Sequence, residues 1–405
     1  MTEISMTRKV NIIGGGPSGL MAAVILSNNN YDVTIYDRKP SFGRKFLLAG
    51  RGGLNITHSE NKEEFLKKYG KSADIFRSIL ETFSQDDLRD WCKELGENTF
   101  IGSSGRVFPK SFKASPLLRS WLSQLKKQKV NFKTNHNWLG WEGDKLIFKS
   151  GNKFIWVEPD LTLLSLGGLS WPKLGSDGSW IKILEKHNIK ISKVQPSNCG
   201  FFVNWSPIFE QRFAGSPIKS VELCFNENRI KGEFIITKGG IEGGVIYTLS
   251  SKFRECIKTN GSAELLIDLK PDLSLKEITR RFSKPRLKST MSNYLRKTIN
   301  LSNVAIGLLI EVQNKMNINN FTSLELAFSI KNLKLILQSP FPIERCISTS
   351  GGVCFNSIDK NFMLINKPNT YVAGEMLDWE APTGGYLLQG CISNGAFVAQ
   401  SIMQR

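Results

Sequence analysis

The stretch VNIIGGGPSGLMAAVILSNNNYDVTIYDRK, residues 10–39, predicts the fold of the N-terminal part of the chain. Val10–Ile13 is a short apolar run that predicts a buried strand, and three glycines follow it. The next segment, from Pro17 to about Ser27, has the apolar periodicity of a helix. Asp32–Tyr36 predicts a second strand. A strand, a helix and a strand in this order are typical of a parallel βαβ unit.

The glycines match the pattern G-x-G-x-x-G at Gly14, Gly16 and Gly19. The first allows a sharp turn, the second lets a diphosphate approach the backbone, and the third lets the helix pack closely on the strand. The helix start directs free N–H groups and a positive dipole end at that diphosphate. Asp37, 18 residues past Gly19, is placed to accept hydrogen bonds from a ribose. The pattern predicts a dinucleotide site; the alternative is a turn that holds nothing.

Composition describes an ordinary globular protein with two or three domains: 405 residues, 40% hydrophobic and 22% charged. Seven scattered cysteines without a CxxC spacing argue against a disulfide framework, and three histidines argue against a metal site, so no metal is expected. No apolar stretch approaches the roughly 20 residues that span a bilayer, and the N-terminus leaves no room for a signal peptide. We therefore expect a cytoplasmic protein.

The formal net charge of +18 is concentrated in two basic clusters. Residues 106–133 contain eight basic residues and no acidic one, and residues 276–297 contain eight basic residues and one acidic one. Such a field attracts phosphate-bearing ligands, anionic membranes or nucleic acid without choosing among them. A solvated surface is the ordinary explanation of one basic run, so the role of both clusters stays open.

Two further segments predict backbone that approaches a ligand. Residues 38–58 form a basic, glycine-rich loop directly after the second strand. Leu161–Leu166 predicts a buried strand that ends in Gly167 and Gly168, and residues 170–178 predict a turn-rich loop before a helix. Glycines at these places let backbone N–H groups face an anion or a ring system.

The last 60 residues contain a second segment whose pattern is typical of nucleotide binding. Thr370–Ala373 predicts a strand, Gly384 and Gly385 a turn, and residues 386–403 a helix, which together make a second receptor for an anion. Between the two ends, short strands are predicted from about residue 192 to 268, with a hairpin at 234–250, and helices from 273 to 337. A chain whose first and last segments both supply nucleotide contacts suggests an FAD-binding domain in two halves.

These motifs together resemble the BaiN/RdsA-like family of NAD(P)/FAD-dependent oxidoreductases over nearly the whole chain. The resemblance depends on GGGPSGLMAA, GRKFLLAGRGGLNITHSE, GRVFPKSFKA, GGLSWPKLGSDGSW, TKGGIEGGVIY, STSGGV and AGEMLDWEAPTGGYLLQGCISNG. It implies an α/β fold in which a two-part Rossmann-like FAD-binding domain, residues 1–191 and 341–405, is interrupted by an inserted domain. That insert, residues 192–340, would be a β-barrel (192–270) followed by a helical subdomain (271–340).

The resemblance also implies the cofactor contacts, which cover the pyrophosphate, the adenosine ribose, the adenosine half and the flavin end of FAD. The predicted cofactor-binding residues are Gly14, Gly16, Pro17, Ser18, Gly19, Asp37, Arg38, Lys45, Gly50, Arg51, Gly53, Asn55, Trp138, Gly167, Gly168, Gly374, Glu375, Asp378, Gly384, Gly385 and Tyr386. No catalytic residue is assigned, because His58 near the predicted flavin loop is as well explained by a structural hydrogen bond.

Three functions compete. The favoured one is an FAD-dependent oxidoreductase that takes hydride from NAD(P)H and passes it to a small organic acceptor, such as an activated C=C bond. The second is a flavoprotein that modifies RNA, in which the two basic clusters would contact the phosphate backbone. The third is a flavin-bound sensor without turnover. The sequence predicts neither the choice between NADH and NADPH nor the oligomeric state.

Overall fold

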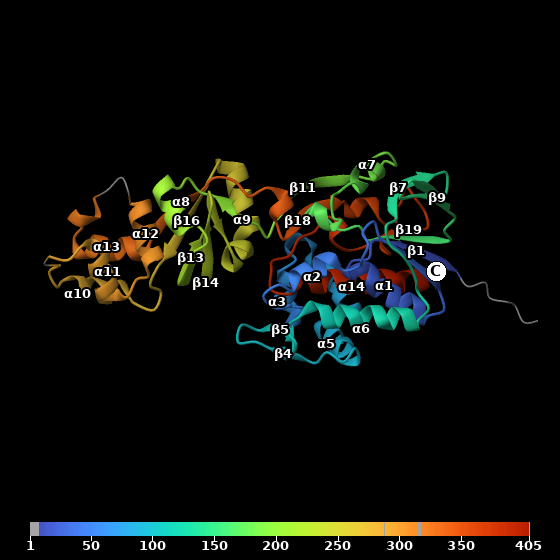
Figure 1. The fold of residues 1–405 in the computed structure, drawn as a ribbon, viewed down its shortest axis with the longest axis horizontal. Helices are drawn as coiled ribbons and strands as arrows, with labels where there is room; N and C mark the ends of the chain where they lie inside the picture. The colour runs from blue at the N-terminus through green and yellow to red at the C-terminus, as the bar shows by residue number, and fades with distance from the viewer. Residues whose placement is uncertain (1–7, 287, 314–316, 405) are drawn as a thin grey trace, which may run out of the picture. The chain divides into compact units, whose positions relative to one another are not determined.

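The computed structural model describes residues 8–286, 288–313 and 317–404. It divides into two units (Figure 1): unit 1 consists of residues 1–196 and 343–405, and unit 2 of residues 197–342. Unit 1 therefore contains both ends of the chain. The predicted domains also include residues 1–7, 287, 314–316 and 405, which lie outside the described residues. The assignment of the units as an FAD-binding domain and its insert stays a prediction.

Unit 1 is built on a parallel sheet with the strand order β19-β10-β1-β2-β6. The strands are β1 (Lys9–Ile13), β2 (Asp32–Tyr36), β6 (Asn131–Lys133), β10 (Leu161–Leu164) and β19 (Thr370–Val372). Ile12 pairs with Leu163 on one side and with Ile35 on the other. All four residues of β10 and the last four of β1 are buried, as expected for strands covered on both faces.

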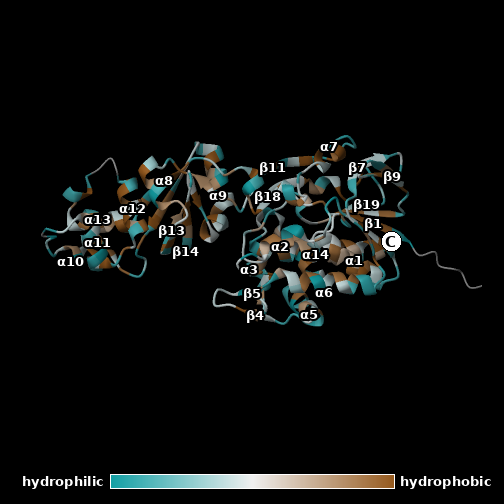
Figure 2. Ribbon diagram, in the orientation of Figure 1, coloured by the Kyte–Doolittle hydropathy of each residue, from teal (hydrophilic) through white to brown (hydrophobic). Residues whose placement is uncertain are grey.

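Two helices from opposite ends of the chain pack together on this sheet: α1 (Pro17–Asn28) and α14 (Tyr386–Met403) (Figure 1). Gly395 of α14 allows this contact, because a Cβ there would stand 2.2 Å from the Ser18 carbonyl oxygen. Figure 2 shows the apolar residues of α1 and α14 in brown, and both helices belong to one buried core. Within the described ranges, none of the helices combines the length and the apolar character that crossing a bilayer requires.

The remaining elements of unit 1 surround this centre. Its helices are α2 (Arg44–Ala49), α3 (Lys62–Lys67), α4 (Ala73–Thr82), α5 (Gln85–Glu94), α6 (Ala114–Lys127) and α7 (Trp180–Glu185). Its other strands form three small sheets: β3 (Thr57–His58), β5 (Arg106–Pro109) and β4 (Thr99–Ile101); β7 (Asn137–Glu142), β8 (Lys145–Ser150) and β9 (Lys153–Val157); β11 (Ile191–Ser197) and β18 (Ser348–Val353).

Unit 2 has an antiparallel sheet with the strand order β12-β15-β14-β13-β16-β17. The strands are β12 (Phe201–Phe202), β13 (Pro217–Phe225), β14 (Asn228–Thr237), β15 (Gly240–Glu242), β16 (Ala263–Asp268) and β17 (Leu333–Leu337). The helices are α8 (Pro207–Phe213), α9 (Gly244–Asn260), α10 (Leu275–Phe282), α11 (Met291–Ile299), α12 (Asn303–Val312) and α13 (Ser323–Lys331).

Two local predictions for this region are wrong. The hairpin predicted at 234–250 ends with β15, because α9 begins at Gly244 and fills the rest of that stretch. Gly243 adopts a φ of +119° that ends the strand, and the apolar residues that follow it recur at helical spacing. The helix predicted up to residue 337 ends earlier, and β17 shows the alternating burial of a strand instead.

The predicted β-barrel of the insert is not established by this sheet. β12 and β17 are the two ends of its strand order. The segment after β17 does return to β12: the Phe202 N–H donates to the Ser339 carbonyl oxygen at 2.8 Å, and the Gln338 N–H donates to the Phe202 carbonyl oxygen at 2.9 Å. These bonds tie the two ends of the sheet together locally, and the barrel itself stays a prediction.

Candidate functional site

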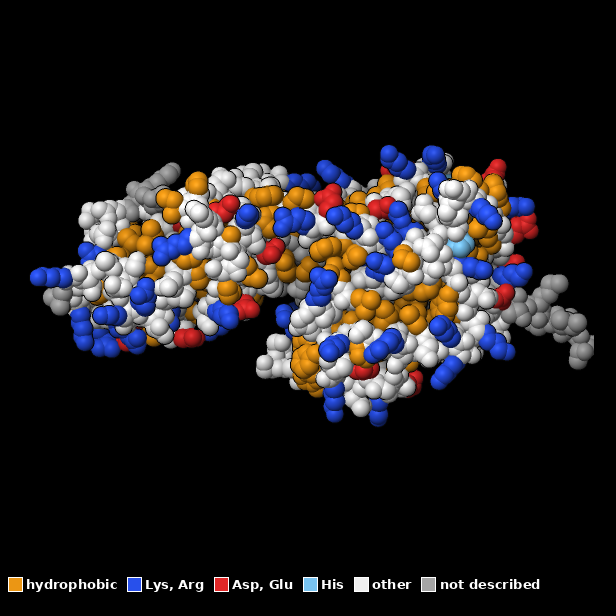
Figure 3. Space-filling model, viewed as in Figure 1, with side chains coloured by type: hydrophobic (Ala, Val, Ile, Leu, Met, Phe, Trp, Pro, Cys, Tyr) orange, Lys and Arg blue, Asp and Glu red, His pale blue; other side chains and the backbone are white. Residues whose placement is uncertain are grey.

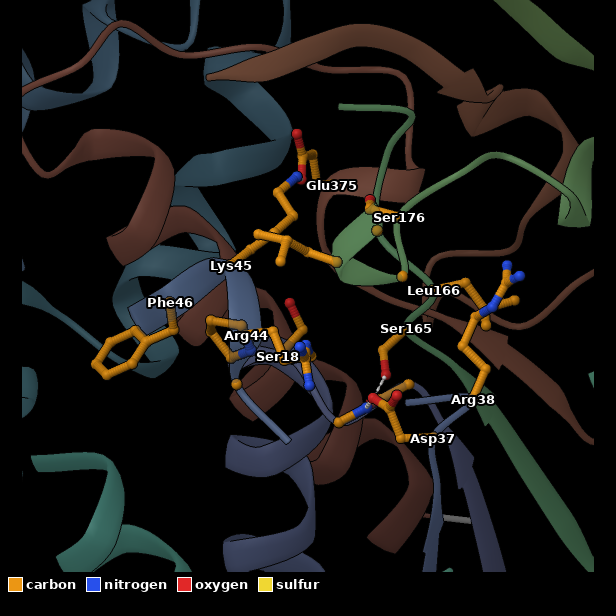
Figure 4. A pocket seen from close by; sticks show the side chains of 18 of the residues that line it. Ser18, Asp37, Arg38, Arg44, Lys45, Phe46, Ser165, Leu166, Ser176 and Glu375 are labelled. Carbon is orange, nitrogen blue, oxygen red and sulfur yellow. Dashed lines mark hydrogen bonds and ion pairs between the residues drawn. The ribbon is translucent and has the colours of Figure 1, made fainter. Parts of the chain in front are cut away.

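Unit 1 contains a pocket at the carboxyl ends of its parallel strands (Figure 4). The residues at or just after the ends of β1, β2, β10 and β19 line it: Ile13, Tyr36, Ser165 and Ala373. Ligands of open parallel sheets bind at this edge. The lining extends to the first turns of α2 and α14, so the N-terminal and C-terminal segments of the chain both contribute.

The glycine turn forms the floor of the pocket. Gly14 adopts a φ of +112°, and a Cβ there would stand 2.2 Å from the Ser165 carbonyl oxygen. A Cβ at Gly16 would have no neighbour within 4 Å. Pro17 and Ser18 begin α1 and also line the pocket. The space beside Gly16 thus faces the start of a helix, where backbone N–H groups attract an anion.

Asp37 is held at the end of β2 by two backbone groups. The Gly15 N–H donates to its Oδ2 at 3.0 Å, and the Lys39 N–H donates to its Oδ1 at 2.8 Å. Burial raises the pKa of the Asp37 carboxyl, whereas these two N–H groups lower it. Each oxygen keeps acceptor capacity for a ligand hydroxyl group, because a carboxylate oxygen has two lone pairs.

Beyond Asp37, the loop after β10 lines the pocket. Arg38 and Asp177 form an ion pair between the end of β2 and this loop, and both side chains line the pocket. Gly167 has a φ of +72° and accepts a hydrogen bond from the Trp180 indole at 3.0 Å. Trp138, also in the lining, is buried.

Two cations from α2 lie beside the glycine turn (Figure 4). The Lys45 ammonium is 2.7 Å from Glu375 Oε2 and 2.8 Å from the Ser170 hydroxyl, and Figure 4 shows the Lys45 and Glu375 side chains pointing toward each other. Arg44 also lines the pocket, and its buried Nε has no hydrogen-bond partner among the described residues. These cations suit a diphosphate.

The other end of the pocket is apolar. Leu387, Leu388 and Cys391 from the first turns of α14 line it, together with Phe46 and Ala49 from α2. Burial raises the pKa of the Cys391 thiol to about 12. A thiol with such a pKa stays protonated at neutral pH, so Cys391 is a packing residue of the wall and a poor nucleophile.

The pocket therefore brings together ten of the predicted residues: Gly14, Gly16, Pro17, Ser18, Asp37, Arg38, Lys45, Trp138, Gly167 and Glu375. The other eleven do not line it. Three of these are glycines that allow close packing, because a Cβ at Gly19 would stand 2.2 Å from a backbone oxygen of the turn. At Gly168 the distance would be 1.9 Å to Thr349 Oγ1, and at Gly374 it would be 2.3 Å to Ser18 Oγ.

Four more lie in the loop after α2. A Cβ at Gly50 would touch α6, and Gly53 adopts a φ of +121°. Arg51 is exposed. The Asn55 amide donates to the carbonyl oxygens of Thr57 and Val107 at 3.0 Å each. These contacts shape the loop without placing it in the lining of the pocket.

The last four lie in the C-terminal segment. Asp378 accepts a hydrogen bond from the Ser192 hydroxyl at 2.5 Å. Gly384 and Gly385 form the turn that begins α14, with φ values of +119° and +95°. The ring of Tyr386, the first residue of α14, packs in the core of unit 1 instead of facing the pocket.

Sequence reasoning missed several lining residues, of which Arg44 and Ser165 matter most for polar contacts. Arg44 precedes Lys45, so a search for every cation in the loop after Asp37 would have found it. The Ser165 hydroxyl donates to the Gly14 carbonyl oxygen at 2.7 Å. That contact joins residues 151 positions apart, and no local pattern signals it.

His58 has a structural role. Its Nε2 lies 2.9 Å from the Ser104 carbonyl oxygen, and its Nδ1 accepts from the Glu60 N–H at 3.2 Å. Both ring nitrogens are thus occupied. In the described ranges, no three His, Cys, Asp or Glu side chains gather in a group that could hold a metal ion.

Two solved structures share the fold of this chain. An open conformation of a flavocytochrome c3 fumarate reductase aligns with 99% of this chain and 78% of its own, at a TM-score of 0.53 and 12% identity. The 3-ketosteroid Δ1-dehydrogenase from Sterolibacterium denitrificans aligns with 98% of this chain and 100% of its own, at a TM-score of 0.53 and 11% identity.

Two relatives match nearly their full lengths. A 3-dehydro-bile acid delta(4,6)-reductase from Clostridium scindens is 23% identical over 98% of this chain and 99% of its own. A ribosomal RNA dihydrouridine synthase from Escherichia coli is 24% identical over 97% of each chain. The family model described as the HI0933-like protein Rossmann domain matches residues 8–401. The chain therefore belongs to the HI0933-like family, which confirms the predicted membership of the BaiN/RdsA-like group.

Proposed function

We propose that the pocket of unit 1 holds FAD and that the protein is an FAD-dependent oxidoreductase. The observation that supports this most is the continuous lining of the pocket. It runs from a ribose acceptor at Asp37, past the glycine turn and the cations of α2, to the apolar first turns of α14. A dinucleotide with a ribose at one end and a flat ring system at the other has this sequence of chemical groups.

The residues present fit FAD. The diphosphate would lie in the open space beside Gly16, with the N–H groups at the start of α1 and the Arg44 guanidinium donating to it. Asp37 would hold the adenosine ribose. Lys45 and Glu375, already paired, would line the ribityl part, and the α14 wall would face the isoalloxazine ring.

When bound, FAD supplies hydride transfer, and the protein supplies position and electrostatics. The N–H groups at the start of α14 would stabilise negative charge on the reduced ring, since the positive end of the helix dipole lies there. The apolar residues Leu387 and Leu388 would exclude water from that end of the pocket.

We further propose NAD(P)H as the hydride donor and a carbon–carbon double bond in a small organic molecule as the acceptor. The names of both relatives describe the reduction of such a bond, in a bile acid and in uridine. A C=C bond accepts hydride when a conjugated carbonyl group takes up the electrons. The substrate of this chain would then be an α,β-unsaturated carbonyl compound.

Anaerobic reduction tests this function. The FAD-loaded protein is mixed with NADH or NADPH, and the flavin absorbance is followed before and after adding 2-cyclohexen-1-one as a simple conjugated ketone. We expect one of the two nucleotides to bleach the flavin and the ketone to restore its colour. Bound FAD that neither nucleotide reduces would support a sensor without turnover.

A second candidate substrate is RNA. The cluster 276–297 falls on α10 and α11 of unit 2, and Figure 3 shows Lys and Arg side chains over the visible face of this unit. Part of its charge is neutralised, because Arg280 and Arg281 both pair with Glu277. The cluster 106–133 lies in unit 1, and Leu287 of the other cluster lies outside the described residues. Tight ribosomal RNA binding that weakens steeply with salt would favour this candidate.

A further inference from the structure

Arg106 is set apart from the rest of its basic cluster by its position. It lies on β5, opposite His58 in the antiparallel pair, and it is half-buried. Its Nε is 3.9 Å from the point where a Cβ of Gly384 would stand. The guanidinium therefore lies beside the turn that begins α14.

The charge of Arg106 is uncompensated. No hydrogen bond or ion pair of its guanidinium is formed with any residue that the structure describes. The carboxylate of Glu60 pairs instead with Lys68, whose ammonium lies 3.8 Å from its Oε2. The Arg106 guanidinium is therefore free to donate to a bound anion or an electron-rich oxygen.

The start of α14 adds to this positive region. Gly385 is the N-cap, no side chain caps the helix, and its first turn contains no acidic residue. Thr57, whose backbone a Cβ at Gly385 would touch at 2.5 Å, is fully buried, and its Oγ1 has no hydrogen-bond partner. A helix start, a free guanidinium and an unpaired hydroxyl together favour an electron-rich oxygen.

We propose that Arg106, beside the start of α14, holds the carbonyl oxygen of an α,β-unsaturated substrate. The inference depends on the proposed function, since the reduced flavin supplies the hydride. The substrate takes the hydride at the carbon β to its carbonyl group, and the C=C electrons move to form an enolate. Arg106 stabilises the enolate oxygen, and a proton from water then adds to the α carbon, which completes the reduction.

The binding of 4-nitrophenol to the FAD-loaded protein tests this inference without turnover. This phenol is coloured only as the phenolate, so its colour reports whether the site stabilises an oxyanion. We expect the wild-type protein to bind it as the phenolate and to lower its apparent pKa. Loss of one charge-assisted hydrogen bond in Arg106→Gln should weaken binding about 10- to 100-fold.

Three comparisons complete the design. Arg106→Lys keeps the charge and should bind the phenolate with intermediate affinity. Arg119→Gln removes an exposed arginine from the same basic cluster and should match the wild type. The neutral ether 4-nitroanisole should bind the wild-type protein at least about 10-fold more weakly than the phenolate, a result that needs no variant to fold.

The outcomes separate the two proposals. A wild-type protein that does not bind the phenolate, or an Arg106→Gln variant that binds it equally well, would overturn the role of Arg106. So would a variant that loses FAD itself, because Arg106 would then hold the cofactor. A wild-type protein that takes up no FAD would overturn the proposed function first.

Discussion

Two glycine turns precede two helices of unit 1, and they differ in what surrounds them. Gly16, the N-cap of α1, has no neighbour within 4 Å of the place where a Cβ would stand. Gly385, the N-cap of α14, would bring a Cβ within 2.5 Å of the Thr57 backbone. A side chain at the first turn would point into open space, whereas a side chain at the second would overlap the Thr57 backbone. The N-cap glycine therefore has a different role in each turn, and substitutions can separate the two roles.

The largest expected effects, on FAD binding and on stability, come from replacing Gly16 and Gly385 by alanine, one at a time. Gly16→Ala should leave the thermal stability of the ligand-free protein nearly unchanged, but it should weaken FAD binding at least about 100-fold, since the new methyl group fills the diphosphate space. Gly385→Ala should destabilise the fold by about 1–3 kcal/mol, because its φ is +95° and its Cβ would overlap Thr57. Melting curves and FAD titrations measure both. Equal effects of the two variants on folding would refute the comparison.

Arg44 tests the electrostatics of the first turn. Arg44→Gln removes a cation that lines the pocket beside the turn, and we expect FAD to bind about 10-fold more weakly. The difference in affinity between the wild type and Arg44→Gln should become smaller at high salt to the extent that Arg44 attracts FAD through solvent, because salt screens charges that water separates. Arg119→Gln, on the exposed side of α6, serves as the matched control in fluorescence titrations. Unchanged affinity in Arg44→Gln would mean that the diphosphate lies elsewhere.

The ion pair between Arg38 and Asp177 tests the adenosine end of the pocket. Both side chains are more than a quarter exposed, at 29% and 28%, so the pair contributes at most about 1 kcal/mol. Asp177→Asn should therefore speed FAD release up to about fivefold. Stopped-flow release of FAD measures it. Glu81→Gln, which breaks an exposed pair with Lys62, should leave the rate unchanged.

The smallest expected effect is a pH dependence from Asp37. Burial raises its pKa in the folded state, so its neutral form is favoured there. The stability that Asp37 contributes to the ligand-free protein is fully present below the unfolded pKa of about 3.9 and is lost as pH rises through the folded pKa. The difference in Tm between the wild type and Asp37→Asn should change across this window. A pH-independent difference would show that the Asp37 carboxyl titrates normally.

The predictions that agree best with the structure concern features that neighbouring residues determine. The strand, glycine turn, helix and strand of residues 9–36, the place of Asp37 directly after β2, and the last helix at 386–403 agree with the structure, because each follows from residues close together in the chain. The lining beyond these positions depends on tertiary contacts. Ser165 reaches the Gly14 carbonyl oxygen across 151 positions, and no spacing rule predicts that.

One wrong prediction of secondary structure concerns a segment whose apolar residues fit both the spacing of a strand and that of a helix. Residues 244–250 follow a strand and a glycine pair, and a short apolar run after such a turn fits either a strand or a helix. The length of α9, which continues to Asn260, decides for the helix. Among the predicted cofactor residues that do not line the pocket, Gly19, Gly168 and Gly374 are glycines that allow close packing. A glycine pattern alone does not separate packing from ligand contact.

The equilibrium binding of FAD to the ligand-free protein tests the proposed cofactor site most directly. We predict that FAD binds at one site per chain and that its flavin absorbance changes on binding. We also predict that Gly16→Ala weakens this binding at least about 100-fold while the protein remains folded. A folded wild-type protein that releases no flavin on denaturation and takes up no added FAD would contradict the central claim.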